Sequence, residues 1–126
     1  MAQFSIAKAV DKAFQEHAIV DIHTHLYPPS MGPLYLAGPD ELLTYHYLKA
    51  ECSRMLPEGV SVEAFNTMPK PQQADIIWQQ LFVGDSSPIS EAQQGIVTVM
   101  SRLGLDPRAK DLSEFRAFYA DKSPEE

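Results

Sequence analysis

Only one stretch of this 126-residue chain has the pattern of a β-strand, and that stretch limits what the chain can fold into. Residues 18–23 form a mainly apolar run that leads into His23-Thr24-His25. A short apolar run of this kind predicts a buried strand. A lone strand has two unpaired edges and is not stable by itself. The strand must therefore pair either with another copy of the chain or with strands from outside it, and we favour the second explanation.

The rest of the chain is predicted to be helical, apart from one irregular loop. The prolines and the glycine of residues 27–33 exclude regular structure there. Elsewhere, apolar residues at spacings of three and four, preceded by capping residues, predict helices. These are expected near residues 5–17, 40–55, 61–65, 71–84, 90–103 and 111–119. The expected caps are Asp40, Ser61, Ser90 and Asp111, and the expected stops are Gly84 and Gly104. The predicted fold class is therefore mostly α with one β-strand.

Apolar stripes on these helices identify the candidate core. One stripe lies on the first helix, and another, which includes Trp78 and Phe82, lies on the helix predicted at 71–84. For Trp78 and Phe82 we expect core packing rather than a stacking surface for sugars. The arginines lie within helical surface patterns and are expected to be solvated: Arg54, Arg102, Arg108 and Arg116.

Composition excludes several classes of protein. Hydrophobic residues make up 44% of the chain, enough for a packed core. The net charge of −7 argues against a nucleic-acid partner. No apolar run approaches the roughly 20 residues that span a bilayer. The single cysteine, Cys52, excludes an internal disulfide and is expected to be a small buried hydrophobe. We therefore expect a cytoplasmic protein without membrane segments.

The chemistry of the chain is expected to centre on the predicted strand. Residues i and i+2 of a strand point to the same face, so His23 and His25 can converge on one divalent metal ion. Asp21 shares that face and could accept a hydrogen bond from a ligand imidazole. The alternatives are two strand-end histidines bonded to backbone and a solvated Asp21. Spacing alone does not separate these interpretations.

A second candidate pair, His46-Tyr47, falls within the helix predicted at 40–55. On an unbroken helix both side chains would share an apolar face with Leu42, Leu43 and Ala50. Helical spacing by itself therefore favours a histidine and a tyrosine packed in the core.

Taken together, Asp21-x-His23-x-His25, the loop at 27–33 and the run from Glu41 to Tyr47 resemble the uronate isomerases, a divergent branch of the amidohydrolase superfamily. The resemblance extends through the helical region to Gly104-Leu105-Asp106-Pro107. It implies that the chain is the N-terminal third of a metal-dependent (β/α)8 barrel. Residues 1–33 would supply the first helix, barrel strand 1 and its site loop, and residues 34–126 a helical insertion. The remaining strands, the aspartate that serves the metal and the arginines that hold the substrate carboxylate would lie outside this chain.

The resemblance also implies an activity and roles for the candidate residues. The reaction would interconvert D-glucuronate and D-fructuronate, or D-galacturonate and D-tagaturonate, through an enediol. His23 and His25 would bind a divalent metal, expected to be zinc, and His46 would contact substrate hydroxyls. Tyr47 would donate to the reacting oxygen or relay the proton. The 126-residue chain alone is expected to be inactive, and homo-oligomer formation is left open.

Two other functions are compatible with the sequence. One is a different metal-dependent amidohydrolase, which would hydrolyse a lactone or an amide; His-x-His allows it, and His46-Tyr47 argues against it. The other is a non-catalytic helical interaction module. A panel of substrates would distinguish the first alternative from a uronate isomerase. The effect of removing His23 and His25 on metal content would distinguish the second.

Overall fold

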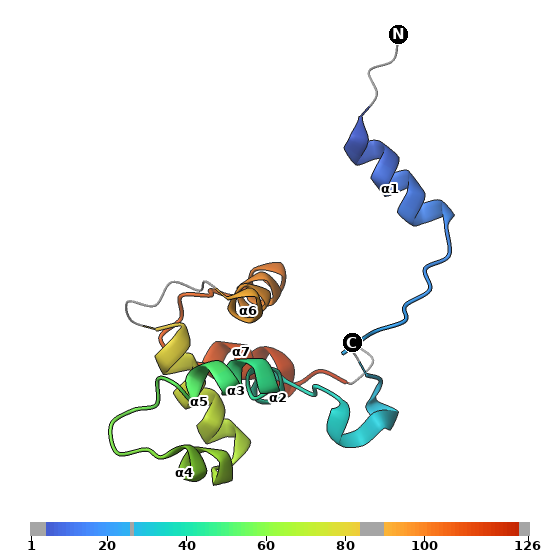
Figure 1. Cartoon of the computed structure of the whole chain (residues 1–126). Coiled ribbons are helices and arrows are strands. Elements are labelled where there is room, and N and C mark those ends of the chain that lie inside the picture. Colours follow the sequence, from blue (N-terminus) through green and yellow to red (C-terminus); the bar gives the residue numbers. More distant parts are fainter. Residues whose placement is uncertain (1–4, 26, 84–89, 124–126) are drawn as a thin grey trace.

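The computed structural model describes residues 5–25, 27–83 and 90–123 (Figure 1). Within those ranges the chain is built of helices joined by turns and extended segments. The helices are α1 (Ile6–Glu16), η1 (Pro29–Leu34, a 3₁₀ helix), α2 (Pro39–Leu43), α3 (His46–Cys52), α4 (Val62–Thr67), α5 (Lys70–Leu81), α6 (Glu91–Arg102) and α7 (Ser113–Ala120). None of the described helices is long and apolar enough to cross a lipid bilayer.

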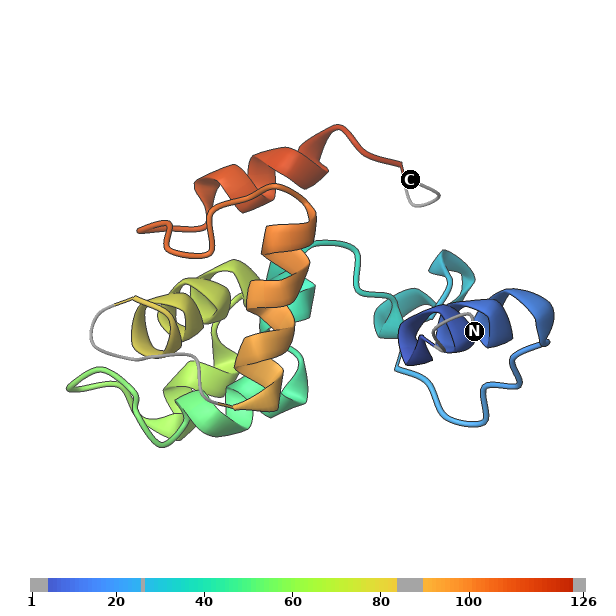
Figure 2. The same ribbon diagram turned by 90° about the horizontal axis from the view of Figure 1, so that it is seen from above.

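Helices α2 to α7 pack around one core, and we call them the helical body. Helix α5 lies against α2 and α3, α7 lies against α2, and α6 lies against α3. Figure 2 shows α6 extending across this group. The buried apolar side chains are Leu43, Leu48, Cys52, Phe65, Ala74, Ile77, Trp78, Leu81, Phe82, Ile96, Met100, Leu112 and Phe115.

Trp78 is the largest of the fully buried side chains. Its ring stacks on Phe82 with centroids 4.7 Å apart, and its indole Nε1–H donates to the Ala109 carbonyl at 3.0 Å. The ring therefore packs on one helix while its polar atom is satisfied by the segment before α7. The predicted core role of Trp78 and Phe82 is confirmed.

Several predicted helix ends are also confirmed. The side chains of Ser61 and Ser90 each accept a backbone N–H three residues later, and Gln93 completes a capping box at Ser90. Gly104 follows α6 with a φ of +74°, a conformation that glycine adopts without steric cost. The predicted stop at Gly84 lies outside the described residues.

The two predicted aspartate caps are wrong in detail. Helix α2 begins at Pro39 after Gly38, so Asp40 lies in the first turn rather than before it. Helix α7 begins at Ser113, and the Asp111 carboxylate accepts the Ser113 backbone N–H at 2.9 Å. Both carboxylates still lie close to a helix N-terminus, where the dipole favours negative charge.

The prediction that Arg116 is a solvated surface side chain is wrong. Its guanidinium lies 2.8 Å from Asp40 on α2 and 2.9 Å from Asp75 on α5. Burial alone would lower the pKa of Arg116, but the hydrogen bonds and charges of the two aspartates outweigh it and raise the pKa. Arg116 therefore holds α7 against α2 and α5. Arg54, Arg102 and Arg108 are exposed, as predicted.

The predicted strand at 18–23 is wrong, and the predicted fold class is wrong with it. The described part of the chain contains no strand, so it is neither a mostly α fold with one β-strand nor a portion of a (β/α)8 barrel. Ile19, Val20 and Ile22 are 71%, 83% and 94% exposed. The physical reason is the one that made a lone strand doubtful: without a neighbouring strand its N–H and C=O groups have no ladder to join.

The single helix predicted at 40–55 is also wrong, because the chain breaks into α2 and α3. Tyr45 between them has extended backbone angles, with φ −62° and ψ 146°. The Thr44 hydroxyl and the Thr44 backbone N–H both donate to the Asp40 carbonyl, at 2.6 and 3.0 Å, and these bonds close the last turn of α2. Leu43 is consequently buried while Tyr47 is 50% exposed, so these residues do not share one apolar face.

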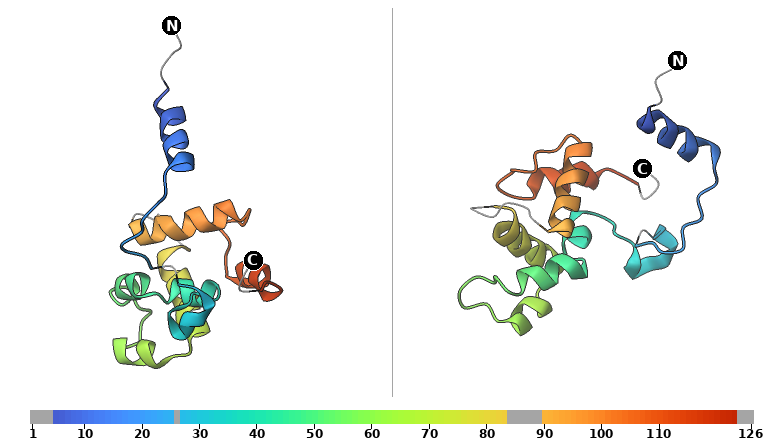
Figure 3. Two further views of the ribbon diagram at one scale, coloured as in Figure 1. Left: turned by 90° about the vertical axis from the view of Figure 1, so that its right-hand side faces the viewer. Right: turned by 45° about the horizontal axis from the view of Figure 1, so that its top comes forward.

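Helix α1 forms as predicted but its apolar stripe is not buried. Ile6, Val10 and Phe14 are 73%, 47% and 67% exposed. Figures 1 and 3 show α1 lying apart from the helical body, with an extended segment running from it toward η1. The predicted boundary between the segment 1–33 and the helical insertion 34–126 stays a prediction.

Candidate functional site

Five aromatic side chains, which we call the histidine–tyrosine cluster, gather where the extended segment after α1 meets the start of α3. They are His23, His25, Tyr45, His46 and Tyr47. The ring centre of His25 lies 4.8 Å from His23, 6.3 Å from His46 and 6.2 Å from Tyr47. The structure thus brings together the two candidate pairs that the sequence places on separate elements.

The two metal-ligand candidates face each other directly. The Nε2 atoms of His23 and His25 lie 3.1 Å apart, and the ring planes are almost perpendicular at 80°. The Asp21 carboxylate accepts the backbone N–H of His23 at 3.0 Å. Asp21 therefore holds the backbone before the first histidine, while its predicted bond to an imidazole stays a prediction.

The spacing of these nitrogens fits a shared metal ion. Zinc-bound imidazole nitrogens lie about 2.0–2.1 Å from the ion, so two of them at octahedral to tetrahedral angles are roughly 2.8–3.4 Å apart. The observed 3.1 Å falls within this range. Within the described ranges no group of three or more His, Cys, Asp or Glu residues could hold a metal ion. His23 and His25 thus fit as a ligand pair, and a complete coordination shell requires further donors.

Tyr45 is the member of the cluster that the sequence interpretation missed. Its phenol oxygen is hydrogen-bonded to Nδ1 of His25, across a separation of 20 residues. Desolvation, together with the nearby Tyr47 and Tyr27, raises the pKa of Tyr45. Its phenol is therefore uncharged at neutral pH. Helical periodicity gave no signal for this residue, because the contact depends on the extended backbone between α2 and α3.

His46 and Tyr47 are accessible rather than packed in the core. Their ring centres are 4.0 Å apart, and the His46 ring also lies 4.3 Å from that of Tyr45. Tyr47 is 50% exposed and His46 is also exposed. The core interpretation that spacing favoured for these two residues is therefore wrong, because the first turn of α3 presents them at the surface of the helical body.

Open hollows border the cluster on two sides. Tyr45 and His46 line a cavity of about 290 Å³, together with Glu41 and Lys70. Tyr47 lines another of about 420 Å³, which also includes Glu51. Both hollows have polar groups in their walls and are large enough for several water molecules or a small polar ligand.

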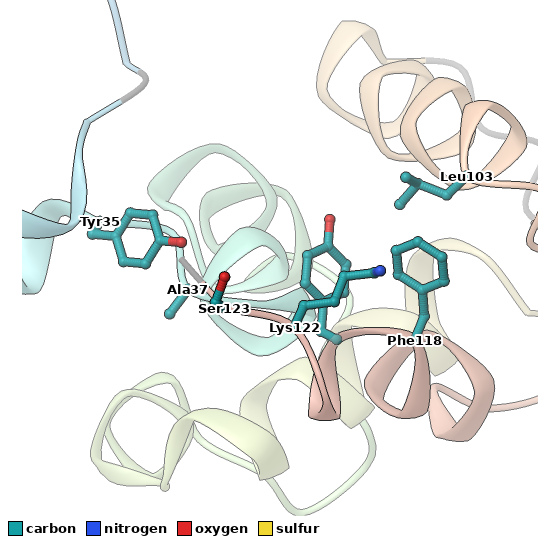
Figure 4. A pocket seen from close by; sticks show the side chains of 7 residues that line it. Tyr35, Ala37, Leu103, Phe118, Lys122 and Ser123 are labelled. Carbon is teal, nitrogen blue, oxygen red and sulfur yellow. The ribbon is translucent and has the colours of Figure 1, made fainter. Parts of the chain in front are cut away.

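A further cavity, shown in Figure 4, has a different character. Its volume is about 390 Å³, and its lining includes Tyr35, Leu103 and Phe118. Lys122 lies over the Phe118 ring at 4.7 Å from the centroid. The lining contains no histidine, carboxylate or thiol. This cavity therefore lacks the groups that general acid–base chemistry uses most often.

Cys52 takes no part in any of these sites. It is fully buried in the core, and burial raises the pKa of its thiol to about 11. Because the thiolate is the nucleophilic form, this side chain is unreactive at neutral pH. The prediction that Cys52 is a buried hydrophobe is confirmed.

Comparison with protein-family models found no match, and comparison with curated proteins found none either. Among solved structures, the chain is similar to the crystal structure of a uronate isomerase from Bacillus halodurans C-125, with 46% sequence identity and a TM-score of 0.77. The match covers 95% of this chain and 28% of that one. The resemblance to uronate isomerases found in the sequence is therefore confirmed, and this chain spans little more than a quarter of the enzyme's length.

Proposed function

We propose that the protein containing this chain interconverts aldose and ketose uronates, either D-glucuronate with D-fructuronate or D-galacturonate with D-tagaturonate. The similarity to a uronate isomerase at 46% identity supports the reaction class. The observation that carries the proposal is the convergence of His23 and His25, with Nε2 atoms 3.1 Å apart, beside the exposed His46-Tyr47 pair.

Such an isomerisation moves a carbonyl group to the neighbouring carbon. A base removes a proton from the carbon next to the carbonyl, and the substrate becomes an enediol. A proton is then delivered to the former carbonyl carbon, while a hydroxyl proton is transferred between the two oxygens. The site must therefore stabilise developing negative charge on oxygen and must hold at least one group that moves protons.

His23 and His25 are proposed to hold a divalent cation, expected to be zinc. The cation would act as a Lewis acid at the substrate oxygens. Both imidazoles must be neutral to bind it, since the coordinating nitrogen has to present its lone pair. The backbone bond from His23 N–H to Asp21 fixes the chain immediately before this pair.

His46 and Tyr47 are proposed to act on the substrate itself. Tyr47 is half exposed, and its phenol can donate to a substrate oxygen or accept and return a proton. The His46 ring, 4.0 Å from that of Tyr47, offers a donor and an acceptor to sugar hydroxyls. Because each residue borders a hollow, a ligand in either hollow can reach the cluster.

The test uses the polypeptide made from the native gene, supplied with zinc, and follows conversion of glucuronate and galacturonate by proton NMR. We expect a ketose product. His23→Ala and His25→Ala should lose both bound zinc and turnover. His17→Ala, which removes an exposed histidine at the end of α1, should retain both. Tyr47→Phe should keep its zinc and lose about 10²–10⁴-fold in kcat.

Other results would replace the proposal with one of its alternatives. Hydrolysis of a lactone or an amide, with no conversion of either uronate, would identify a different amidohydrolase. Metal content unchanged by His23→Ala and His25→Ala, together with a stable oligomer and no turnover, would favour an interaction module.

A further inference from the structure

We propose that Tyr45 is a positioning residue for His25: its phenol oxygen holds the Nδ1 side of the imidazole so that Nε2 faces His23. This inference rests on the proposed metal-binding role of the two histidines. It assigns to Tyr45 no contact with substrate, and it concerns a residue that neither the His-x-His pattern nor the His46-Tyr47 pair identifies.

The geometry ties a loosely held ring to the helical body. His25 lies on the extended segment after α1, where the backbone forms no helix or strand. Its Nε2 side faces His23, and its Nδ1 side is hydrogen-bonded to Tyr45 at the start of α3. The rings of His25 and Tyr45 meet edge to face, with centres 5.7 Å apart and planes at 71°. Rotation of the imidazole about its side-chain bonds would break both interactions at once.

The Tyr45 hydroxyl could donate to Nδ1 or accept from it, and the proposed metal-binding role selects the direction in which Nδ1–H of His25 donates. A neutral imidazole has one N–H, and the nitrogen that binds a metal must present its lone pair. If Nε2 of His25 faces the cation, the proton lies on Nδ1 and is donated to the Tyr45 oxygen. Histidines that bind metals generally donate their second nitrogen in this way, and loss of the acceptor typically weakens metal binding about 10–100-fold.

The break between α2 and α3 is what places Tyr45 in this position. On a continuous helix Tyr45 would lie about 100° around the axis from His46. With extended backbone at Tyr45, its ring lies 4.3 Å from that of His46 and 5.6 Å from that of Tyr47. The ring therefore packs within the cluster while its hydroxyl group reaches His25. Removing the hydroxyl alone leaves the ring contacts in place and isolates the hydrogen bond.

The test compares Tyr45→Phe with wild type and with a matched control, Tyr119→Phe. Tyr119 lies on α7, half buried, with its ring against Phe115 and Phe118. Zinc affinity is measured by competition with a chelator, on the polypeptide made from the native gene. The tautomer of His25 is read from the nitrogen chemical shifts of metal-free, ¹⁵N-histidine-labelled protein, with His25→Gln used for assignment.

We expect Tyr45→Phe to weaken zinc binding about 10–100-fold. We also expect the His25 proton to move from Nδ1 toward Nε2, while Tyr119→Phe changes neither property. An unchanged tautomer or an unchanged zinc affinity in Tyr45→Phe overturns the inference. So does a wild-type protein that binds zinc no more tightly than His23→Ala.

Turnover of uronates is scored separately, which distinguishes the two proposals. Zinc binding that depends on Tyr45, in a protein that converts neither uronate, supports the role of Tyr45 and overturns the proposed function. Turnover by wild type with undiminished zinc affinity in Tyr45→Phe overturns the role of Tyr45 alone.

Discussion

The region from α1 to η1 and the helical body carry similar apolar patterns with opposite outcomes. In the first region Phe14 on α1 and Ile22 on the extended segment are 67% and 94% exposed. In the helical body, Ile77 and Trp78 on α5 are at most 1% exposed. The difference is that α5 has α2 and α3 beside it, whereas every described residue of α1 is exposed. A periodic pattern indicates which face can be buried, but burial requires a neighbour.

The histidine–tyrosine cluster lies where these two regions meet. His23 and His25 come from the exposed segment, and the tyrosines come from the body. The hydrogen bond between Tyr45 and His25 joins the two sides. The proposed chemistry therefore depends on residues of the helical body holding residues of a segment that has little packing of its own.

The largest expected effect is the loss of core packing around α5. Trp78→Ala removes a buried ring that stacks on Phe82, so the free energy of unfolding should fall by about 3–5 kcal/mol. Ile22→Ala removes a side chain that is 94% exposed and should change it by less than about 0.5 kcal/mol. Urea unfolding followed by circular dichroism measures both. Equal effects of the two variants would mean that the contrast in burial does not describe the protein in solution.

A smaller effect is expected from the ion pairs. Arg116 has a side chain that is 33% exposed and pairs with Asp40, which is 19% exposed. Arg116→Met keeps much of the aliphatic stem but leaves Asp40 without its cation, so the free energy of unfolding should fall by about 1–2 kcal/mol. Lys12→Met breaks the pair between Lys12 and Glu16 on α1. These two side chains are 71% and 57% exposed, so the free energy of unfolding should fall by at most about 0.5 kcal/mol. A loss from Lys12→Met as large as that from Arg116→Met would contradict this ranking.

The smallest expected effect concerns pH and the buried thiol. Burial raises the pKa of Cys52 from 9.0 to about 11, so in this interval the unfolded chain releases the proton first. The contribution of Cys52 to stability is complete below pH 9 and is lost as the pH rises toward 11. At pH 10 the loss should be about 1 kcal/mol. In urea titrations between pH 8 and 10, wild type should lose stability more steeply than Cys52→Ala, and parallel curves would refute the expectation.

Much of the helical body could be predicted from the sequence because its signals are local. Serine caps at Ser61 and Ser90 and a glycine after α6 satisfy backbone groups within a few residues, whatever lies further away. The break at Tyr45 was missed because the leucines on one side and His46-Tyr47 on the other continue the same spacing. There Leu43 and Leu48 are buried on either side of an extended Tyr45, an arrangement that the spacing does not reveal.

For the candidate site, the sequence identified most of the residues that take part, and the structure showed which of them lie close together. His23 and His25 are recognisable from their spacing, which also places them close together without a strand. The proximity of Tyr45 to His25 could not be predicted, because it links residues 20 positions apart through an irregular junction. The roles assigned to these side chains stay proposals until metal binding and turnover are measured.

The sequence by itself determined most of the helical segments, many of their ends and which residue types can carry chemistry, because these depend on neighbours within about four residues. It missed the 3₁₀ helix η1, which forms where no regular structure was predicted, and the break between α2 and α3. Only the tertiary structure decided that residues 18–23 form no strand, that Arg116 joins three helices, and that Tyr45 lies against His25. The physical reason is common to all three. A ladder, an ion-pair network or a contact between distant residues needs a partner from elsewhere in the chain, and a local pattern does not specify where that partner will lie.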